Sequence, residues 1–164
     1  MYKTKLFFLL LLSALLSGCF SGTAQYTGIS FPPTAASTIV FQESDVPRSC
    51  SAFAHLLMTT KENSRGDEIS SSIQKEAELR GADRILIGLS RENESNLDEN
   101  RFEYYGPDYA YNFNKTWLGW KFGFDTWNDA GPLVGLGVNN MGNSDVSFEN
   151  SLLIQAVFLR CNAE

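Results

Sequence analysis

Four stretches of the chain carry the apolar or alternating pattern that is typical of β-strands. Thr38 to Gln42 is β-branched and apolar, and Arg84 to Leu89 has the pattern of a short buried strand. Cys50 to Thr60 is mostly apolar on both faces, which favours a central strand and leaves a short helix as the alternative. Val146 to Cys161 ends the sequence with a long apolar strand. These stretches predict one sheet whose strands are largely buried.

The segment from Asp67 to Arg80 has the clearest helical pattern. Ile69, Ile73 and Ala77 recur at four-residue spacing and form one narrow apolar stripe. Acidic residues begin the segment, where they stabilise a helix by interacting with the positive end of its dipole, and Gly81 is placed to end it. We therefore expect an α+β fold, with a small, mostly antiparallel sheet and one main helix packed on one face of it.

Polar and aromatic stretches separate these elements. Lys61 to Gly66 is predicted to be a charged turn, and Arg91 to Asn100, rich in Glu and Asn, a solvated loop. An aromatic-rich segment, 101–127, follows; its residues 102–127 include 11 aromatic residues. Within it, Trp117 to Phe124 alternates as a strand does. Residues 128–142 are rich in Gly and Asn, which fits a hairpin or a bend between strands.

The first 18 residues have the form of a secretory signal peptide. Lys3 and Lys5 precede an apolar run, and small residues follow it. That run has about half of the ~20 residues that a transmembrane helix needs, so a retained membrane helix is the weaker interpretation. The residues Leu16-Ser17-Gly18-Cys19 resemble the lipobox of bacterial lipoproteins. The alternative is an ordinary signal peptide with an incidental cysteine after it.

The resemblance to lipoproteins implies both a processing step and a location. It implies that residues 1–18 are removed and that Cys19 carries lipid, which makes a membrane the first partner of the protein. Inner-membrane lipoproteins often have Asp after the lipidated cysteine, so Phe20 favours the outer membrane, facing the periplasm, with surface exposure as the alternative. Residues 19–37 are small and polar and fit a flexible tether. Residues 38–164 then form a single periplasmic domain.

The acidic balance of the chain argues against one class of partner. The sequence has 13 basic and 19 acidic residues, a formal net charge of −6. Removal of residues 1–18 deletes two lysines and brings the net charge to about −8. Nucleic-acid binding rewards clustered Lys and Arg, so we expect no nucleic-acid partner.

The three cysteines fit an exported protein. Lipid on Cys19 leaves Cys50 and Cys161, which we expect to form a disulfide in an oxidising compartment, with two buried thiols as the alternative. His55 is the only histidine and no Cys-x-x-Cys pair is present, so we predict no metal site and no cofactor.

No residue pattern points to catalysis. His55 lies in an apolar run and the chain lacks Gly-x-Ser-x-Gly, which favours a structural histidine over a general base. The carboxylates of residues 92–99 crowd a polar loop, where solvated charge is favoured over a glycosidase pair. Gly135 to Gly142 lacks the glycine spacing and the lysine of a nucleotide loop. We therefore expect no enzyme activity, and a hydrolase has the least support.

The aromatic-rich segment is the candidate binding surface. Large rings offer wide contact area at low entropic cost, which suits a platform for glycan, for peptide or for a membrane protein. The alternative is that about half of these rings fill the core of a small domain. The candidate surface consists of Tyr104, Tyr105, Tyr109, Tyr111, Trp117, Trp120 and Trp127.

Three further segments resemble the small periplasmic lipoproteins related to the Rcs stress-sensor lipoprotein. They are Val46 to Cys50, the helix-to-strand junction Ile73 to Ile87, and Ala156 to Cys161, with Asp83 where the family usually has Asn. The resemblance implies a compact α+β domain with a disulfide to its last strand. Residues 91–145 depart from that pattern. We expect a non-enzymatic envelope lipoprotein that binds or senses through protein contacts, with binding of cell-wall glycan (peptidoglycan) as the alternative.

Overall fold

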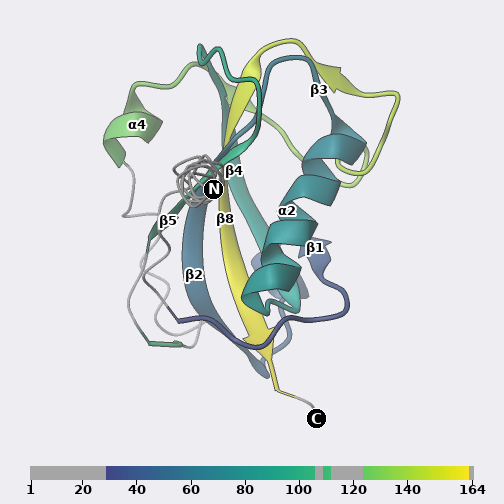
Figure 1. Ribbon diagram of the computed structural model, residues 1–164, viewed down its shortest axis with the longest axis vertical. Helices are drawn as coiled ribbons and strands as arrows, with labels where there is room; N and C mark the ends of the chain where they lie inside the picture. The colour runs from purple at the N-terminus through teal and green to yellow at the C-terminus, as the bar shows by residue number, and fades with distance from the viewer. Residues whose placement is uncertain (1–28, 106–108, 112–123, 163–164) are drawn as a thin grey trace, which may run out of the picture.

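The structure is a computed structural model that describes residues 29–105, 109–111 and 124–162. Its main sheet has the strand order β1-β4-β8-β2-β5, with the short β6 also beside β4 (Figure 1). Only the β1–β4 pair is parallel among the pairs described. The predicted α+β fold with a mostly antiparallel sheet is therefore confirmed. The strands are β1 (Thr38–Val40), β2 (Cys50–Thr59), β4 (Arg84–Asn93), β5 (Arg101–Tyr105), β6 (Leu133–Val134) and β8 (Ser151–Cys161).

Five smaller or helical elements complete the described part of the chain. The main helix α2 spans Gly66–Arg80, and the short helix α4 spans Phe124–Asn128. A 3-10 turn, η2, spans Glu43–Asp45. Two two-residue strands, β3 (Ser64–Arg65) and β7 (Ser147–Phe148), pair with each other. No helix in these ranges is long and apolar enough to cross a membrane.

The last strand of the chain lies in the middle of the sheet. β8 pairs antiparallel with β2 on one side and with β4 on the other, so β2 and β4 run in the same direction with β8 between them. This is a split β-α-β arrangement, because α2 connects the two outer strands. Residues 151–159 are all buried. The central place of β8 explains its sequence, because a strand that is covered on both faces needs apolar residues at consecutive positions.

Helix α2 covers one face of the sheet through the apolar stripe that the sequence predicts. Ile69, Ile73 and Ala77 are fully buried in one core cluster with Phe53 and Phe158. Figure 1 shows α2 lying across the strands on that face. The predicted helix, Asp67 to Arg80, is confirmed, with one more residue at its start.

Gly81 ends α2 as expected. It has φ = +80°, in the left-handed region where a Cβ is disfavoured, and its N–H is bonded to the helix carbonyls of Ala77 and Glu78. A Cβ at this position would lie 2.6 Å from the carbonyl oxygen of Pro32. The glycine thus allows both the turn and the close approach of the preceding segment.

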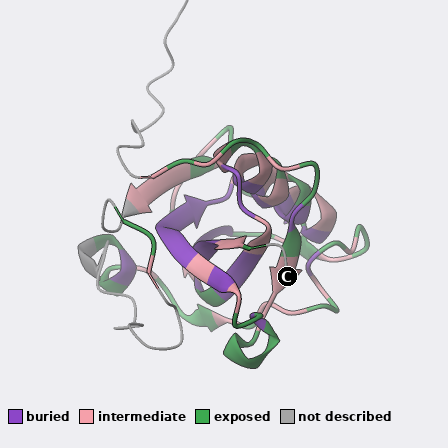
Figure 2. Ribbon diagram, turned by 90° about the horizontal axis from the view of Figure 1, so that it is seen from below, coloured by how far each residue is buried: buried purple, intermediate pink, exposed green. Residues whose placement is uncertain are grey.

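The second face of the sheet is also buried. Val46 packs on Ala52 and Val157 there, and Trp127 of α4 packs on Leu57 and Leu153. Viewed from the end of the sheet, buried strands occupy the centre and exposed segments surround them (Figure 2). The pattern of Cys50 to Thr60, apolar on both faces, is therefore explained by a central strand, and the helical alternative is wrong.

Two predicted boundaries differ from the structure, and one prediction lies outside it. β4 continues from Leu89 to Asn93, into the predicted loop, because β8 is long enough to pair with its polar residues, Glu92 with Leu152 for example. The predicted turn at residues 61–66 contains the two-residue strand β3. The predicted strand Trp117 to Phe124 lies outside the described residues except for Phe124, at which α4 begins.

Candidate functional site

Cys50 and Cys161 form the predicted disulfide. The two residues are direct partners in the β2–β8 ladder, with their Cα atoms 3.8 Å apart, and Cys50 is buried. They are 111 residues apart in sequence, so the bond closes a loop through most of the domain. In the chain-entropy model a loop of ~100 residues stabilises the fold by roughly 4.7 kcal/mol, although measured effects are often smaller. The bond ties the two central strands at one end of the sheet.

Asp83 organises the backbone next to this disulfide. Its Oδ2 accepts a hydrogen bond of 2.8 Å from the backbone N–H of Cys161 and lies 3.5 Å from Nε of Arg160. Arg160 also donates from Nη1 to the carbonyl of Gly81, at 3.0 Å. The carboxylate therefore supplies both an acceptor and a charge, whereas the amide of Asn would supply no charge for Arg160.

The segment before β1 joins the domain at the same end. The N–H of Phe31 is bonded to the carbonyl of Arg80, and the Phe31 ring packs edge-on against Phe53 with 5.0 Å between centroids. Thr34 is bonded through its N–H to Glu78 and through its hydroxyl to Ala82. The predicted tether, residues 19–37, thus overlaps the folded domain from Phe31 onward. Cys19 lies outside the described residues.

Tyr104, the first residue of the candidate aromatic surface, belongs to the structure that attaches β5 to α2. Its hydroxyl is hydrogen-bonded to Oε1 of Glu76, which also accepts from Nε of Arg80 at 3.0 Å. The Arg80 guanidinium lies over the Tyr104 ring, 4.8 Å from its centroid. Burial, and then the bond to the Glu76 carboxylate, raise the pKa of Tyr104. The ring is half-buried against Phe158 and acts mainly in packing.

Tyr111 covers His55 on the second face of the sheet. A backbone bridge pairs Tyr111 with Ala52, and the Tyr111 ring stacks on the His55 ring with 5.8 Å between centroids. The Tyr111 hydroxyl is hydrogen-bonded to Nε2 of His55. Burial lowers the pKa of His55 to about 4, because the cation loses its hydration. The imidazole is therefore neutral at pH 7, and its described Nε2 partner is a tyrosine rather than a serine or a thiol.

The other aromatic candidates divide between core and surface. Trp127 is buried at 7% exposure, with the Arg91 guanidinium 5.2 Å from the centroid of its ring. Tyr109 is 63% exposed. Tyr105 is the backbone partner of His55 in the β2–β5 ladder, and Trp117 and Trp120 lie outside the described residues. The described rings thus lie on both faces of the sheet and do not form one platform.

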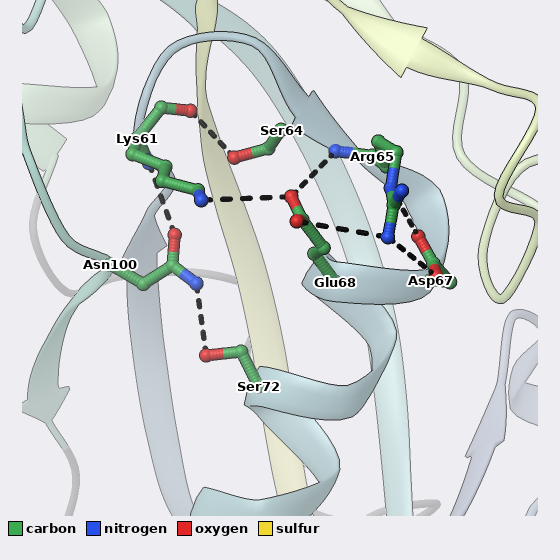
Figure 3. Close-up of polar contacts among 7 residues, drawn as sticks. All are labelled: Lys61, Ser64, Arg65, Asp67, Glu68, Ser72 and Asn100. Atoms are coloured by element: carbon green, nitrogen blue, oxygen red, sulfur yellow. Dashed lines mark hydrogen bonds and ion pairs between the residues drawn. The ribbon is translucent and has the colours of Figure 1, made fainter.

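A polar network that the sequence did not predict lies where α2 begins (Figure 3). Glu68 accepts from the backbone N–H of Arg65 and lies 3.7 Å from the ammonium of Lys61. Asn100 accepts from the backbone N–H of Lys61, at 3.0 Å, and donates to the hydroxyl of Ser72, at 2.9 Å. Asn100 thereby holds the end of the 94–100 loop against the helix. Its residue type alone carries no such signal, because both partners are distant in sequence.

An open cavity of about 310 Å³ lies at the same end of the sheet. Carboxylates and carboxamides form much of its wall, and Glu92 is held there by a 3.1 Å hydrogen bond from Asn150. Among the described residues, no group of His, Cys, Asp and Glu is arranged to hold a metal ion. The cavity is lined by Glu92, Asn93, Glu94, Asp129, Gly131, Pro132 and Asn150.

Comparison with known proteins adds no further constraint, because no protein-family model, curated protein or solved structure matches this chain. The resemblances to lipoproteins and to the Rcs-related lipoproteins therefore stay predictions from the sequence.

Proposed function

We propose that this protein is a lipid-anchored domain of the bacterial envelope that binds or senses through protein contacts and has no catalytic activity. The observation that carries the proposal is the position of Phe31, bonded to Arg80 at the disulfide end of the sheet. Only the short segment 20–30 separates it from Cys19, so a lipid on that cysteine would hold the folded domain close to a membrane.

The disulfide supports the location part of the proposal. Structural disulfides form and persist in oxidising compartments such as the periplasm, and are rare in reducing ones. The Cys50–Cys161 bond joins two central strands, and it uses both cysteines that a lipid on Cys19 would leave. Export, lipidation of Cys19 and oxidation of the other pair therefore account for all three cysteines.

The arrangement of side chains supports a role in binding rather than in catalysis. The chain's single histidine is buried and bonded to Tyr111, and Tyr104 is bonded to Glu76 within the packing of α2 against β5. A flat aromatic platform for sugar has less support than the sequence suggested, because Trp127 is buried. We therefore favour protein contacts through charged surface residues and loops, where binding residues are commonly found.

Labelling with a palmitate analogue tests the anchor. The wild-type chain should incorporate the label and fractionate with membranes, and Cys19→Ser should lose both properties, because serine cannot form the thioether. Ser21→Ala, two residues downstream, is the matched control and should behave as wild type. Equal labelling of Cys19→Ser would contradict the proposal.

Photo-crosslinking in cells tests the partner. A crosslinkable amino acid placed at Tyr109, which is 63% exposed, or at Leu89, which is 50% exposed, should give a discrete protein adduct from at least one position. Ile73, which is fully buried in the core, is the negative-control position. Retention of the purified domain on peptidoglycan without any protein adduct would contradict protein binding and favour the glycan alternative.

A further inference from the structure

The two ends of the main sheet differ in what they carry. β2 and β4 have 10 residues each and β8 has 11, so the ends lie about 30 Å apart at 3.3 Å per residue. We call the end with the disulfide and Phe31 the tether end, made of residues 29–50, 76–86 and 157–162. The opposite loop end is made of residues 59–68, 91–101 and 129–150. All of these residues are described.

The tether end is where the segment toward Cys19 is held. The Phe31 ring lies between Phe53 and the guanidinium of Arg160, 5.8 Å from the latter, and the Phe31 N–H is bonded to Arg80. Figure 1 shows the first described residues running across the end of the sheet at which the C-terminus lies. Cys19 precedes Ile29 by 10 positions, which bounds the separation of the two residues to about 35 Å. The segment that would carry the lipid therefore joins the described domain at its tether end.

Charge is distributed unevenly between the two ends. The loop end has 10 carboxylates against four cations, a net charge of −6, whereas the tether end has five carboxylates against four arginines, a net charge of −1. Glu94, Asp98 and Glu99 are exposed at the loop end, and Arg48 is exposed at the tether end. The loop-end carboxylates are Glu62, Asp67, Glu68, Glu92, Glu94, Asp98, Glu99, Asp129, Asp145 and Glu149.

We propose that the anchored domain lies on an anionic lipid bilayer with its tether end toward the lipid and its acidic loop end away from it. An anionic surface repels the loop end over a Debye length of about 10 Å at 0.1 M salt, and it repels the nearly neutral tether end much less. The Phe31 attachment and the charge therefore favour the same orientation. The loop end, with its cavity of about 310 Å³, is then the surface that partners in the envelope meet.

Paramagnetic relaxation tests this orientation, which rests on the proposed lipidation of Cys19. The lipidated full chain is placed in phosphatidylglycerol nanodiscs containing a gadolinium-chelating lipid, and amide NMR intensities are compared with and without the metal. The amides of Asp83, Arg84 and Arg160 should lose more intensity than those of Glu94 and Glu149. Equal losses at both ends, or larger losses at the loop end, would overturn the proposal.

A charge-reversed variant separates electrostatic orientation from the tether alone. Glu94→Lys, Asp98→Lys and Glu99→Lys together should raise the loss of intensity at the loop end, because repulsion from the lipid is removed. Glu43→Lys with Asp45→Lys, at exposed positions of the tether end, is the matched control and should keep the wild-type pattern. If the triple variant showed the same loss of NMR intensity at the loop end as wild type, the role of charge in the orientation would be refuted.

The two proposals fail in distinguishable ways. A wild-type chain that takes up no lipid and does not float with liposomes refutes the proposed function. A chain that is lipidated and floats, but whose two ends lose equal NMR intensity, refutes only the orientation.

Discussion

Acidification should destabilise the fold through His55, the only histidine of the chain. Its side chain is 4% exposed, stacked under Tyr111 and bonded to the Tyr111 hydroxyl. Tyr111 is itself partly buried, which raises its pKa, so its hydroxyl stays protonated and neutral beside the imidazole. Protonation must therefore place a cation where hydration is lost, and burial lowers the pKa of His55 to about 4.

The sign and size of the effect follow from proton linkage. Between pH 6.5 and pH 4 the unfolded chain binds a proton at His55 and the folded chain does not, so the free energy of unfolding falls as the pH falls. The contribution is complete above pH 6.5. With an unfolded pKa near 6.5 and a folded pKa of about 4, the loss is about 2 kcal/mol at pH 5 and about 3 kcal/mol once both states are protonated.

Urea unfolding at pH 8, 6.5 and 5, followed by circular dichroism with the disulfide intact, measures this loss. His55→Gln is the matched variant, because glutamine keeps an acceptor for the Tyr111 hydroxyl and does not titrate. We expect the variant to be less stable than wild type at pH 8 and to lose much less stability between pH 8 and pH 5. If both proteins lose the same free energy over that range, the reasoning about His55 is refuted.

Three other changes test the packing. Reducing the Cys50–Cys161 bond should lower the free energy of unfolding by about 2–4 kcal/mol, measured by urea unfolding with and without dithiothreitol; an unchanged midpoint would count against a structural disulfide. Gly81→Ala should lower the free energy of unfolding by about 1–2 kcal/mol for the left-handed φ alone, and a thermal midpoint equal to that of wild type would contradict that conformation. Ile73→Ala should cost about 2–5 kcal/mol, whereas Leu79→Ala, at 59% exposure, should change stability by less than about 0.5 kcal/mol; similar losses in both would contradict the assigned helix face.

The sequence alone determined the main helix and the disulfide. The helix was predicted from a local apolar pattern, and the disulfide from the number of cysteines. The stripe of Ile69, Ile73 and Ala77 has the spacing of one helix face, and Gly81 supplies a helix end that most residues disfavour. Three cysteines, one of them in a lipobox-like motif, left one pair to consider. No distant contact had to be known for either prediction.

The candidate site was predicted less well, because its contacts join residues far apart in the chain. Glu76 and Tyr104 are 28 residues apart, and His55 and Tyr111 are 56 apart. An aromatic residue offers the same large surface to a core and to a ligand, so composition could not sort Trp127, which is buried, from Tyr109, which is exposed. Burial became visible only once the opposing elements were in place.

Tertiary structure decided the order of the strands and the attachment of the segment before β1. An apolar run predicts that β8 is buried, but its place between β2 and β4 depends on ladders with two segments whose paired residues precede it by 58 to 111 positions. Those same ladders extended β4 through polar residues to Asn93. Phe31, in a stretch with the composition of a tether, packs on the core because α2 and the disulfide end offer it a site. The local sequence pattern predicts which side chains are buried, and only the tertiary structure determines which residues they pack against.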